Sequence, residues 1–177
     1  MNKMKKIILF FVVLAFGFSA AAEPRLSNWP VDENTRILWY WGPRPEIIPG
    51  VGRFHSGIDF DVPEGTPVLA TCNGIVIQTA NHLQYGKTIV IRMDNGLTTA
   101  DIHLNRIDVT INQNVAAGQQ IGLSGNTGLW TNFRHLHFSV WAPGANIPDF
   151  TRGDLFITRE TIDPLTVLPP RNRQESR

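Results

Sequence analysis

The sequence predicts an all-β domain whose antiparallel strands form a sandwich or a barrel-like structure. Short runs rich in β-branched and aromatic residues recur along the chain, and clusters of Gly, Asn, Asp and Pro separate them. One separator, Asp94-Asn95-Gly96, is typical of a hairpin, because Asn and Gly accept the positive φ that a tight turn requires. No segment has a sustained helical period, which also favours strands.

The first 22 residues are expected to be a secretory signal peptide rather than part of this domain. Lys3, Lys5 and Lys6 make a positive start, residues 7–18 are almost entirely apolar, and residues 19–22 are small and suited to cleavage. The apolar run is too short for a comfortable membrane span, although an uncleaved N-terminal anchor is the alternative interpretation. We therefore expect an exported protein of the periplasm or cell envelope, rather than of the extracellular medium, with no stable membrane span after cleavage.

The remaining sequence has the size of one ordinary domain, because removal of the signal peptide leaves 155 of the 177 residues. Three of the 16 basic residues leave with the signal peptide and none of the 15 acidic ones, so the net charge becomes −2. A mildly acidic protein has no electrostatic reason to bind nucleic acid or an anionic membrane. Cys72 is the single cysteine and cannot form an internal disulfide, so we expect it to be a small buried residue of a conventional hydrophobic core.

In chain order, an arm, a domain and a tail follow the signal peptide. Residues 23–36 are polar and proline-containing, which is typical of an irregular arm. Residues 37–165 form the predicted domain, and residues 166–177 are expected to be a flexible C-terminal tail. Residues 42–52 read as a loop, and the expected strands are 36–41, 66–70, 74–80, 87–93, 97–103, 109–111, 119–123 and 136–141.

The run HLHFSVW at 135–141 alternates polar and apolar residues. Alternation of period two predicts a strand with one packed face and one open face. His135 and His137 share the open face with Ser139 and Trp141, and two imidazoles on a rigid strand can converge on one point. That geometry suits one metal ligand with a general acid or base beside it, whereas two surface histidines on a half-exposed strand are the alternative interpretation.

Two further candidate ligands stand near the start of the domain. His55 and Asp59 are four residues apart, so in an extended segment they project to the same side. Imidazole and carboxylate are ordinary zinc ligands, although a surface ion pair would also explain this spacing. With one histidine of the H-x-H run they would supply three protein ligands and leave a fourth position for water, which is the arrangement of a catalytic zinc site. His103 lies at a strand end, and His82 lies in a loop where we expect a surface residue.

These residues stand in motifs that resemble the lysostaphin/LytM family of zinc metallopeptidases, the glycyl-glycine and D,D-endopeptidases that cut peptide cross-links of bacterial peptidoglycan. The resemblance covers about residues 37–141 and reaches to Asp163-Pro164. No motif is specific alone, but all occur in the family's order: Trp41-Gly42-x-Arg44, Arg53-Phe54-His55-Ser56-Gly57-Ile58-Asp59-Phe60, Gly65-Thr66-Pro67-Val68, Tyr85-Gly86, Ala117-Gly118-Gln119, Ser124-Gly125-Asn126-Thr127-Gly128 and His135-Leu136-His137-Phe138.

The resemblance implies a curved antiparallel β fold with long loops that wall a narrow groove. It implies that His55, Asp59 and His137 bind Zn²⁺, and that His103 and His135 are catalytic histidines outside the ligand set. Zinc-bound water would be the nucleophile, and the two histidines would serve as acid/base groups and oxyanion stabilisers. The expected partners are peptidoglycan stem peptides and cross-links, and the protein is expected to be a monomer.

Three positions depart from the family pattern and bear on specificity and rate. Asp101 stands where the family usually has Tyr, and its carboxylate could orient the His103 ring, raise the pKa of His103 or face solvent. Arg134 stands in place of a common Pro, and its charge at the groove would favour substrates with a free carboxylate nearby. Ser139 stands in place of a common Glu.

Some alternatives stay open at the level of the sequence. The competing function is a metal-free relative that binds peptidoglycan or activates a partner hydrolase, although such relatives typically lack ligands that this chain keeps. Among substrates, a short acidic exported domain favours D-Ala–diamino acid cross-links over glycine bridges. The sequence does not decide which of His103 and His135 is the base, nor whether residues 23–36 cover the groove and make the enzyme latent.

Overall fold

The computed structural model describes residues 23–46, 52–153 and 160–171. The expected signal peptide lies outside the described residues, and so do residues 172–177 of the expected tail. The described chain consists of strands, turns and one short 3₁₀ turn, η1 (Pro164–Thr166). No helix in these ranges is long and apolar enough to cross a membrane. The predicted all-β fold is confirmed.

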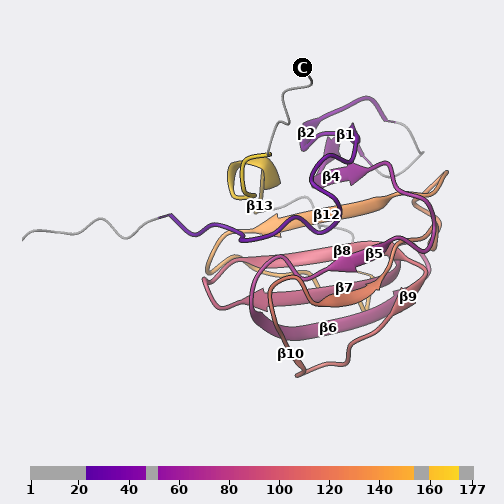
Figure 1. Ribbon diagram of the computed structural model, residues 1–177. Coiled ribbons are helices and arrows are strands. Elements are labelled where there is room, and N and C mark those ends of the chain that lie inside the picture. Colours follow the sequence, from indigo (N-terminus) through magenta and orange to yellow (C-terminus); the bar gives the residue numbers. More distant parts are fainter. Residues whose placement is uncertain (1–22, 47–51, 154–159, 172–177) are drawn as a thin grey trace, which may run out of the picture.

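The larger sheet contains the strands that surround the histidine-rich motifs. Its members are β1 (Ile37–Trp39), β4 (Gly57–Phe60), β6 (Gly74–His82), β7 (Gly86–Met93), β8 (Thr98–Leu104), β10 (Asn114–Val115), β12 (Leu136–Trp141) and β13 (Thr161–Ile162). The strand order is β1-β4-β12-β8-β7-β6-β10, with β13 paired to β12 outside this path (Figure 1). Every one of these pairings is antiparallel. Strands β4 and β12, far apart in the sequence, are therefore direct neighbours.

A smaller sheet covers one face of the larger one. It consists of β5 (Pro67–Leu69), β9 (Arg106–Ile107) and β11 (Gln120–Leu123), in the order β5-β11-β9. Apolar residues of both sheets form one core cluster, in which Ile89 and Phe138 of the larger sheet meet Val68 and Ile121 of the smaller one. A two-stranded ribbon, β2 (Gly42–Pro43) with β3 (Phe54–His55), lies next to β1 and β4 (Figure 1).

The opposite face of the larger sheet is also covered. A second apolar cluster there contains Tyr85, Val90, Trp141 and Phe150. Phe150 belongs to the segment that follows β12, and it packs edge-on against Trp141 with 6.3 Å between ring centroids. All six residues of β12 are consequently buried, so the prediction that this strand has one open face is wrong. The reason is that the chain after β12 folds back over the face that alternation alone assigned to solvent.

Two strand assignments differ from the prediction. The expected strand at 109–111 is absent, and this segment connects β9 to β10 through Asn112, whose φ of 68° breaks an extended run. Strand β4, in contrast, is not among the predicted strands, because its four residues follow a Pro/Gly-rich loop and their alternation is too short to indicate a strand. Its residues are all buried, and β4 lies between β1 and β12.

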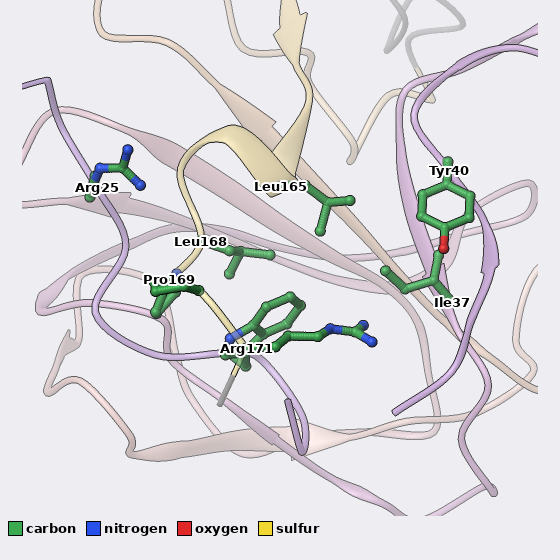
Figure 2. Close-up of a pocket in the computed structure, with 9 residues that line it drawn as sticks. Arg25, Ile37, Tyr40, Leu165, Leu168, Pro169 and Arg171 are labelled. Atoms are coloured by element: carbon green, nitrogen blue, oxygen red, sulfur yellow. The ribbon is translucent and has the colours of Figure 1, made fainter. Parts of the chain in front are cut away.

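The N-terminal arm and the C-terminal turn pack against each other beside the core. Leu26 donates its backbone N–H to Val167 O at 2.8 Å, and both side chains are buried. Arg171 stacks over the ring of Trp29 at 4.9 Å, so the first part of the segment expected to be a flexible tail is packed. A groove of about 770 Å³ lies at this junction, with Tyr40 at one side (Figure 2).

Candidate active site

The register of β4 and β12 brings two of the predicted ligands together. Asp59 lies directly opposite His137, and Gly57 lies opposite Ser139. Residues directly opposite each other in an antiparallel pair point to the same face of the sheet. The third predicted ligand, His55, ends β3 four residues before Asp59 and turns toward the same point. Sequence positions that are 82 residues apart thus share one site.

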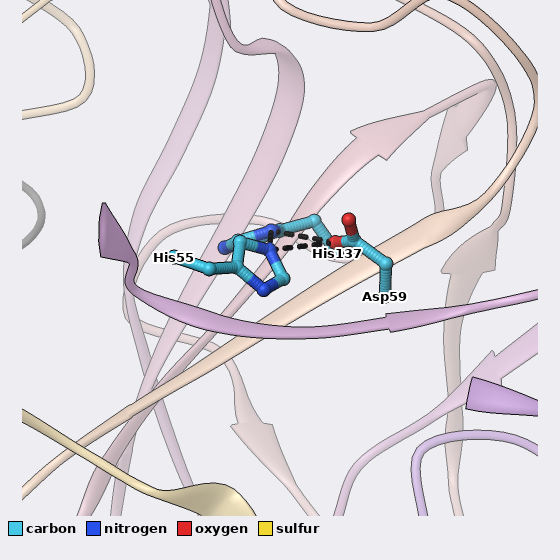
Figure 3. Close-up of side chains that lie close together, drawn as sticks. All are labelled: His55, Asp59 and His137. Carbon is cyan, nitrogen blue, oxygen red and sulfur yellow. Dashed lines mark hydrogen bonds and ion pairs between the residues drawn. The ribbon is translucent and has the colours of Figure 1, made fainter. Parts of the chain in front are cut away.

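One atom from each of the three side chains lies close to the other two (Figure 3). His55 Nε2 lies 3.1 Å from Asp59 Oδ1 and 3.0 Å from His137 Nδ1, and His137 Nδ1 lies 2.8 Å from Asp59 Oδ1. All three residues are buried, with exposed fractions of 2%, 4% and 7% for His55, Asp59 and His137. Atoms that each bind one zinc ion at roughly 2.0–2.2 Å can lie about 3 Å from one another. These residues form the group of His, Cys, Asp and Glu side chains in the described ranges that could hold a metal ion.

The far nitrogen of each of these two imidazoles is held by a neighbour. His55 Nδ1 donates to the backbone carbonyl of Tyr40 at 2.9 Å, which leaves Nε2 with its lone pair. His137 Nε2 lies 2.8 Å from Ser139 Oγ, which leaves Nδ1 facing Asp59. Contacts of this kind set the tautomer and the orientation of metal-binding histidines. Ser139, which stands in place of a common Glu, is thus a direct contact of His137.

The electrostatics match the protonation states that metal ligands need. Burial by itself would raise the pKa of Asp59, but hydrogen bonds with His137 and His55 outweigh it and hold that pKa well below its usual value. Burial lowers the pKa of His137 to about 4, against the opposing effect of Asp59. A carboxylate and neutral imidazoles are the forms that bind a divalent metal, since metal binding requires deprotonated ligands. The residues present therefore fit such an ion.

His103 and His135 stand beside this cluster. Their ring centroids are 4.9 Å apart, and the His103 ring is 6.3 Å from that of His137. His135 Nε2 lies 3.7 Å from Asp59 Oδ1. Each ring donates Nδ1–H to a backbone carbonyl, that of Thr127 at 2.8 Å for His103 and that of Phe133 at 2.9 Å for His135. Nε2 of each ring is therefore left with its lone pair.

His103 reaches the site through a bulge in β8. Lys87 pairs with Leu104 but Ile89 pairs with Asp101, so β8 has one extra residue at this point. His103 adopts a φ of 66° there, a conformation that a non-glycine residue avoids unless its surroundings impose it. Regular alternation would leave His103 on the core face with Asp101, and the extra residue instead turns its ring toward His135 and His137. Burial, followed by the neighbouring His135 and His137, lowers the pKa of His103 to about 3.

Asp101 does not have the role that the sequence suggested. It lies opposite Phe138 and Ile89 in the two neighbouring strands, and both of those residues belong to the main core. Only 2% of Asp101 is exposed, and its Oδ1 atom has no hydrogen-bond partner. Desolvation raises the pKa of Asp101 to about 8. The expectations that it faces solvent, or that it orients His103 or raises its pKa, are wrong.

Two arginines near the site have different surroundings. Arg134, expected to offer a free charge at the groove, donates Nη1 to Val62 O at 3.1 Å and lies 3.5 Å from Asp61 Oδ1. Arg44 was noticed in the sequence only as part of a motif, and its Nε atom is buried with no hydrogen-bond partner.

The remaining histidine, His82, is half-buried rather than on the surface, and its Nδ1 accepts a hydrogen bond from the backbone of Gln84.

Comparisons with known proteins agree with this site. Residues 53–148 match the sequence profile of Peptidase family M23. The peptidoglycan DD-endopeptidase ShyA of Vibrio cholerae serotype O1 is 41% identical over 130 residues, which are 68% of this chain and 30% of ShyA. This chain spans about a third or less of the length of such curated relatives.

Solved structures show the same fold. The catalytic domain of the antimicrobial peptidase lysostaphin from Staphylococcus simulans superposes with a TM-score of 0.63 at 28% identity, over 75% of this chain and 91% of that domain. A zinc-containing peptidase from Vibrio cholerae superposes with a TM-score of 0.60 at 34% identity, over 71% of this chain and 41% of that protein.

Proposed function

This chain belongs to Peptidase family M23, and from that premise we propose that it is a zinc-dependent endopeptidase that hydrolyses peptide cross-links of bacterial peptidoglycan. The convergence of His55 Nε2, Asp59 Oδ1 and His137 Nδ1, each about 3 Å from the others, is the observation that supports the proposal most strongly. The same three residues were inferred from the sequence as ligands. A likeness to a zinc-containing peptidase favours zinc among divalent metals.

In the proposed reaction, His55, Asp59 and His137 hold the zinc ion. When bound, zinc acts as a Lewis acid that lowers the pKa of water to near 7 and polarises the scissile carbonyl. His103 and His135 act as the proton carriers. Each has a fixed Nδ1–H and a free lone pair on Nε2, so it can accept a proton from the attacking water and, once protonated, donate an N–H to the oxyanion or to the leaving amine.

The cross-link between D-Ala and a diamino acid is the proposed substrate bond. ShyA, a relative at 41% identity, is named a peptidoglycan DD-endopeptidase, whereas the lysostaphin domain is more distant at 28% identity. Action on peptidoglycan would place the protein in the cell envelope. Digestion of walls with defined cross-links, with the fragments identified by mass spectrometry, tests this assignment: products cut only at glycine bridges would contradict it.

Metal content and activity of point variants test the roles. Asp59→Asn should lose both zinc and hydrolysis, because it removes a charged ligand. His103→Ala and His135→Ala should keep zinc and lose roughly 10²–10⁴ in rate. His82→Ala is the matched control, since His82 is a histidine outside the cluster, and it should retain both.

Two outcomes would contradict these assignments. A folded His135→Ala protein without zinc would make His135 a ligand rather than a proton carrier. Wild-type protein that binds no zinc and shows no zinc-dependent hydrolysis would instead favour the metal-free relative that binds peptidoglycan or activates another hydrolase.

A further inference from the structure

The pairing of β2 with β3 places Arg44 close to His55, one of the three proposed zinc ligands. It directly follows β2, in which Gly42 is paired with His55 and Pro43 with Phe54. The Arg44 backbone N–H continues this ribbon by donating to Arg53 O at 2.9 Å. Burial lowers the pKa of the Arg44 guanidinium, and the negative charge of Asp59 opposes this shift. Arg44 is thus attached to the strand that presents His55.

The Arg44 side chain is only partly solvated and its Nε–H has no acceptor. The Nε atom is buried without a hydrogen-bond partner. Arg36 and Arg134, in contrast, both form ion pairs with Asp61, at 3.1 Å and 3.5 Å. Among the described residues, no carboxylate lies within ion-pairing distance of Arg44. Burial of a guanidinium donor without an acceptor is costly, and each such group in a folded protein calls for an explanation.

We propose that Arg44 forms a subsite that binds a free carboxylate of the peptide substrate. The proposal rests on the proposed peptidase function, because it concerns the substrate of that site. A guanidinium offers pairs of parallel N–H groups in the geometry of a carboxylate, and Arg44 is only partly buried, so its guanidinium can present such a pair to a ligand although Nε itself is covered. Stem peptides with a diamino acid carry such carboxylates, whereas glycine bridges have none in their interior. Arg134 is less suited to bind the substrate carboxylate, because its charge is already paired with that of Asp61.

A pair of synthetic cross-linked peptides tests this subsite. One peptide keeps the carboxylate next to the scissile bond and the other has a carboxamide there. Wild-type protein should prefer the carboxylate peptide in kcat/KM. Arg44→Gln should lose roughly 10- to 100-fold on the carboxylate peptide and little on the carboxamide, as expected for hydrogen bonds to a charged group. Arg36→Gln removes an equal charge from an exposed arginine and should behave as the wild type.

Equal losses on both peptides in Arg44→Gln would overturn the proposal, because a structural role, or an effect on the metal ligands, would act on both peptides alike. Loss of the preference in Arg134→Gln but not in Arg44→Gln would also overturn it. Zinc content of each variant, measured alongside, shows whether the ligand cluster is intact.

Binding of the cleavage product provides a readout that does not depend on hydrolysis. The Nε–H resonance of Arg44 in ¹⁵N-labelled, zinc-loaded protein should shift on addition of the product peptide with a free carboxylate, and not with its carboxamide. No shift with either peptide would refute the subsite. If the wild type hydrolyses neither cross-linked peptide, the proposed function fails, and this titration still decides whether Arg44 binds a carboxylate.

Discussion

Replacing Asp101 with Asn should remove a pH dependence of folding stability that one buried carboxyl causes. Asp101 lies in the apolar core opposite Phe138 and Ile89, and desolvation raises its pKa to about 8. In the unfolded chain its pKa returns to about 3.9. Between these two values the folded protein binds a proton that the unfolded chain does not, so the free energy of unfolding falls as pH rises.

The slope follows from that single proton. Because one proton is bound only by the folded state, the free energy of unfolding falls by about 1.4 kcal/mol per pH unit. Between pH 5 and pH 7 the wild type should therefore lose about 3 kcal/mol of stability relative to Asp101→Asn. The difference should level off above the folded pKa of about 8 and below the unfolded value. All other ionisable groups are common to the two proteins, and their contribution therefore cancels in the comparison.

Urea unfolding followed by tryptophan fluorescence at a series of pH values measures this difference. Asp94→Asn is the matched control, since Asp94 is an exposed carboxyl in the hairpin turn after β7, and it should keep the wild-type slope. Parallel stability curves for wild type and Asp101→Asn would refute the reasoning, because they would show that Asp101 has the same affinity for protons folded and unfolded.

Two other substitutions probe how the strands position the site. Gly57→Ala should destabilise the fold by about 1–3 kcal/mol and lower the zinc content, because a Cβ at Gly57 would overlap the carbonyl oxygen of Phe138 across the β4–β12 pairing. Wild-type stability and zinc content in this variant would contradict the prediction. Thr127→Val should lower kcat while zinc content stays unchanged. The Thr127 hydroxyl donates to Leu104 O at 2.7 Å, and this bond holds the Thr127 carbonyl that orients His103. An unchanged kcat would show that this contact is dispensable.

Residue types and local spacing were sufficient to predict much of the fold and of the candidate site. Turn residues at 94–96 and the β-branched runs predicted the β7–β8 hairpin, because tight turns and strands are local properties of the chain. The four-residue spacing of His55 and Asp59 and the H-x-H run predicted a site with three ligands. The family resemblance selected His137 from that run, and these three side chains meet in the structure. Their roles as zinc ligands, and those of His103 and His135 as proton carriers, stay predictions.

Other features depend on which strand lies beside which. Alternation in β12 correctly separates Leu136, Phe138 and Val140 from His135 and His137, but it cannot show that Phe150 covers the second face. The sequence left open that Asp101 orients His103, raises its pKa or faces solvent, and the first two possibilities rested on its place two residues before His103. The bulge between them breaks that relation, since one extra residue turns His103 to the other face of the sheet.

The sequence by itself therefore determined the all-β class, because periodicity and turn chemistry act over a few residues. It also determined the residue types of the candidate ligand set and their order along the chain. Tertiary structure alone decided that Asp59 faces His137, that His103 enters the site with a positive φ, and that the Nε atom of Arg44 lies buried without an acceptor. Strand register and burial set these features, and both depend on contacts between residues that are distant in the sequence.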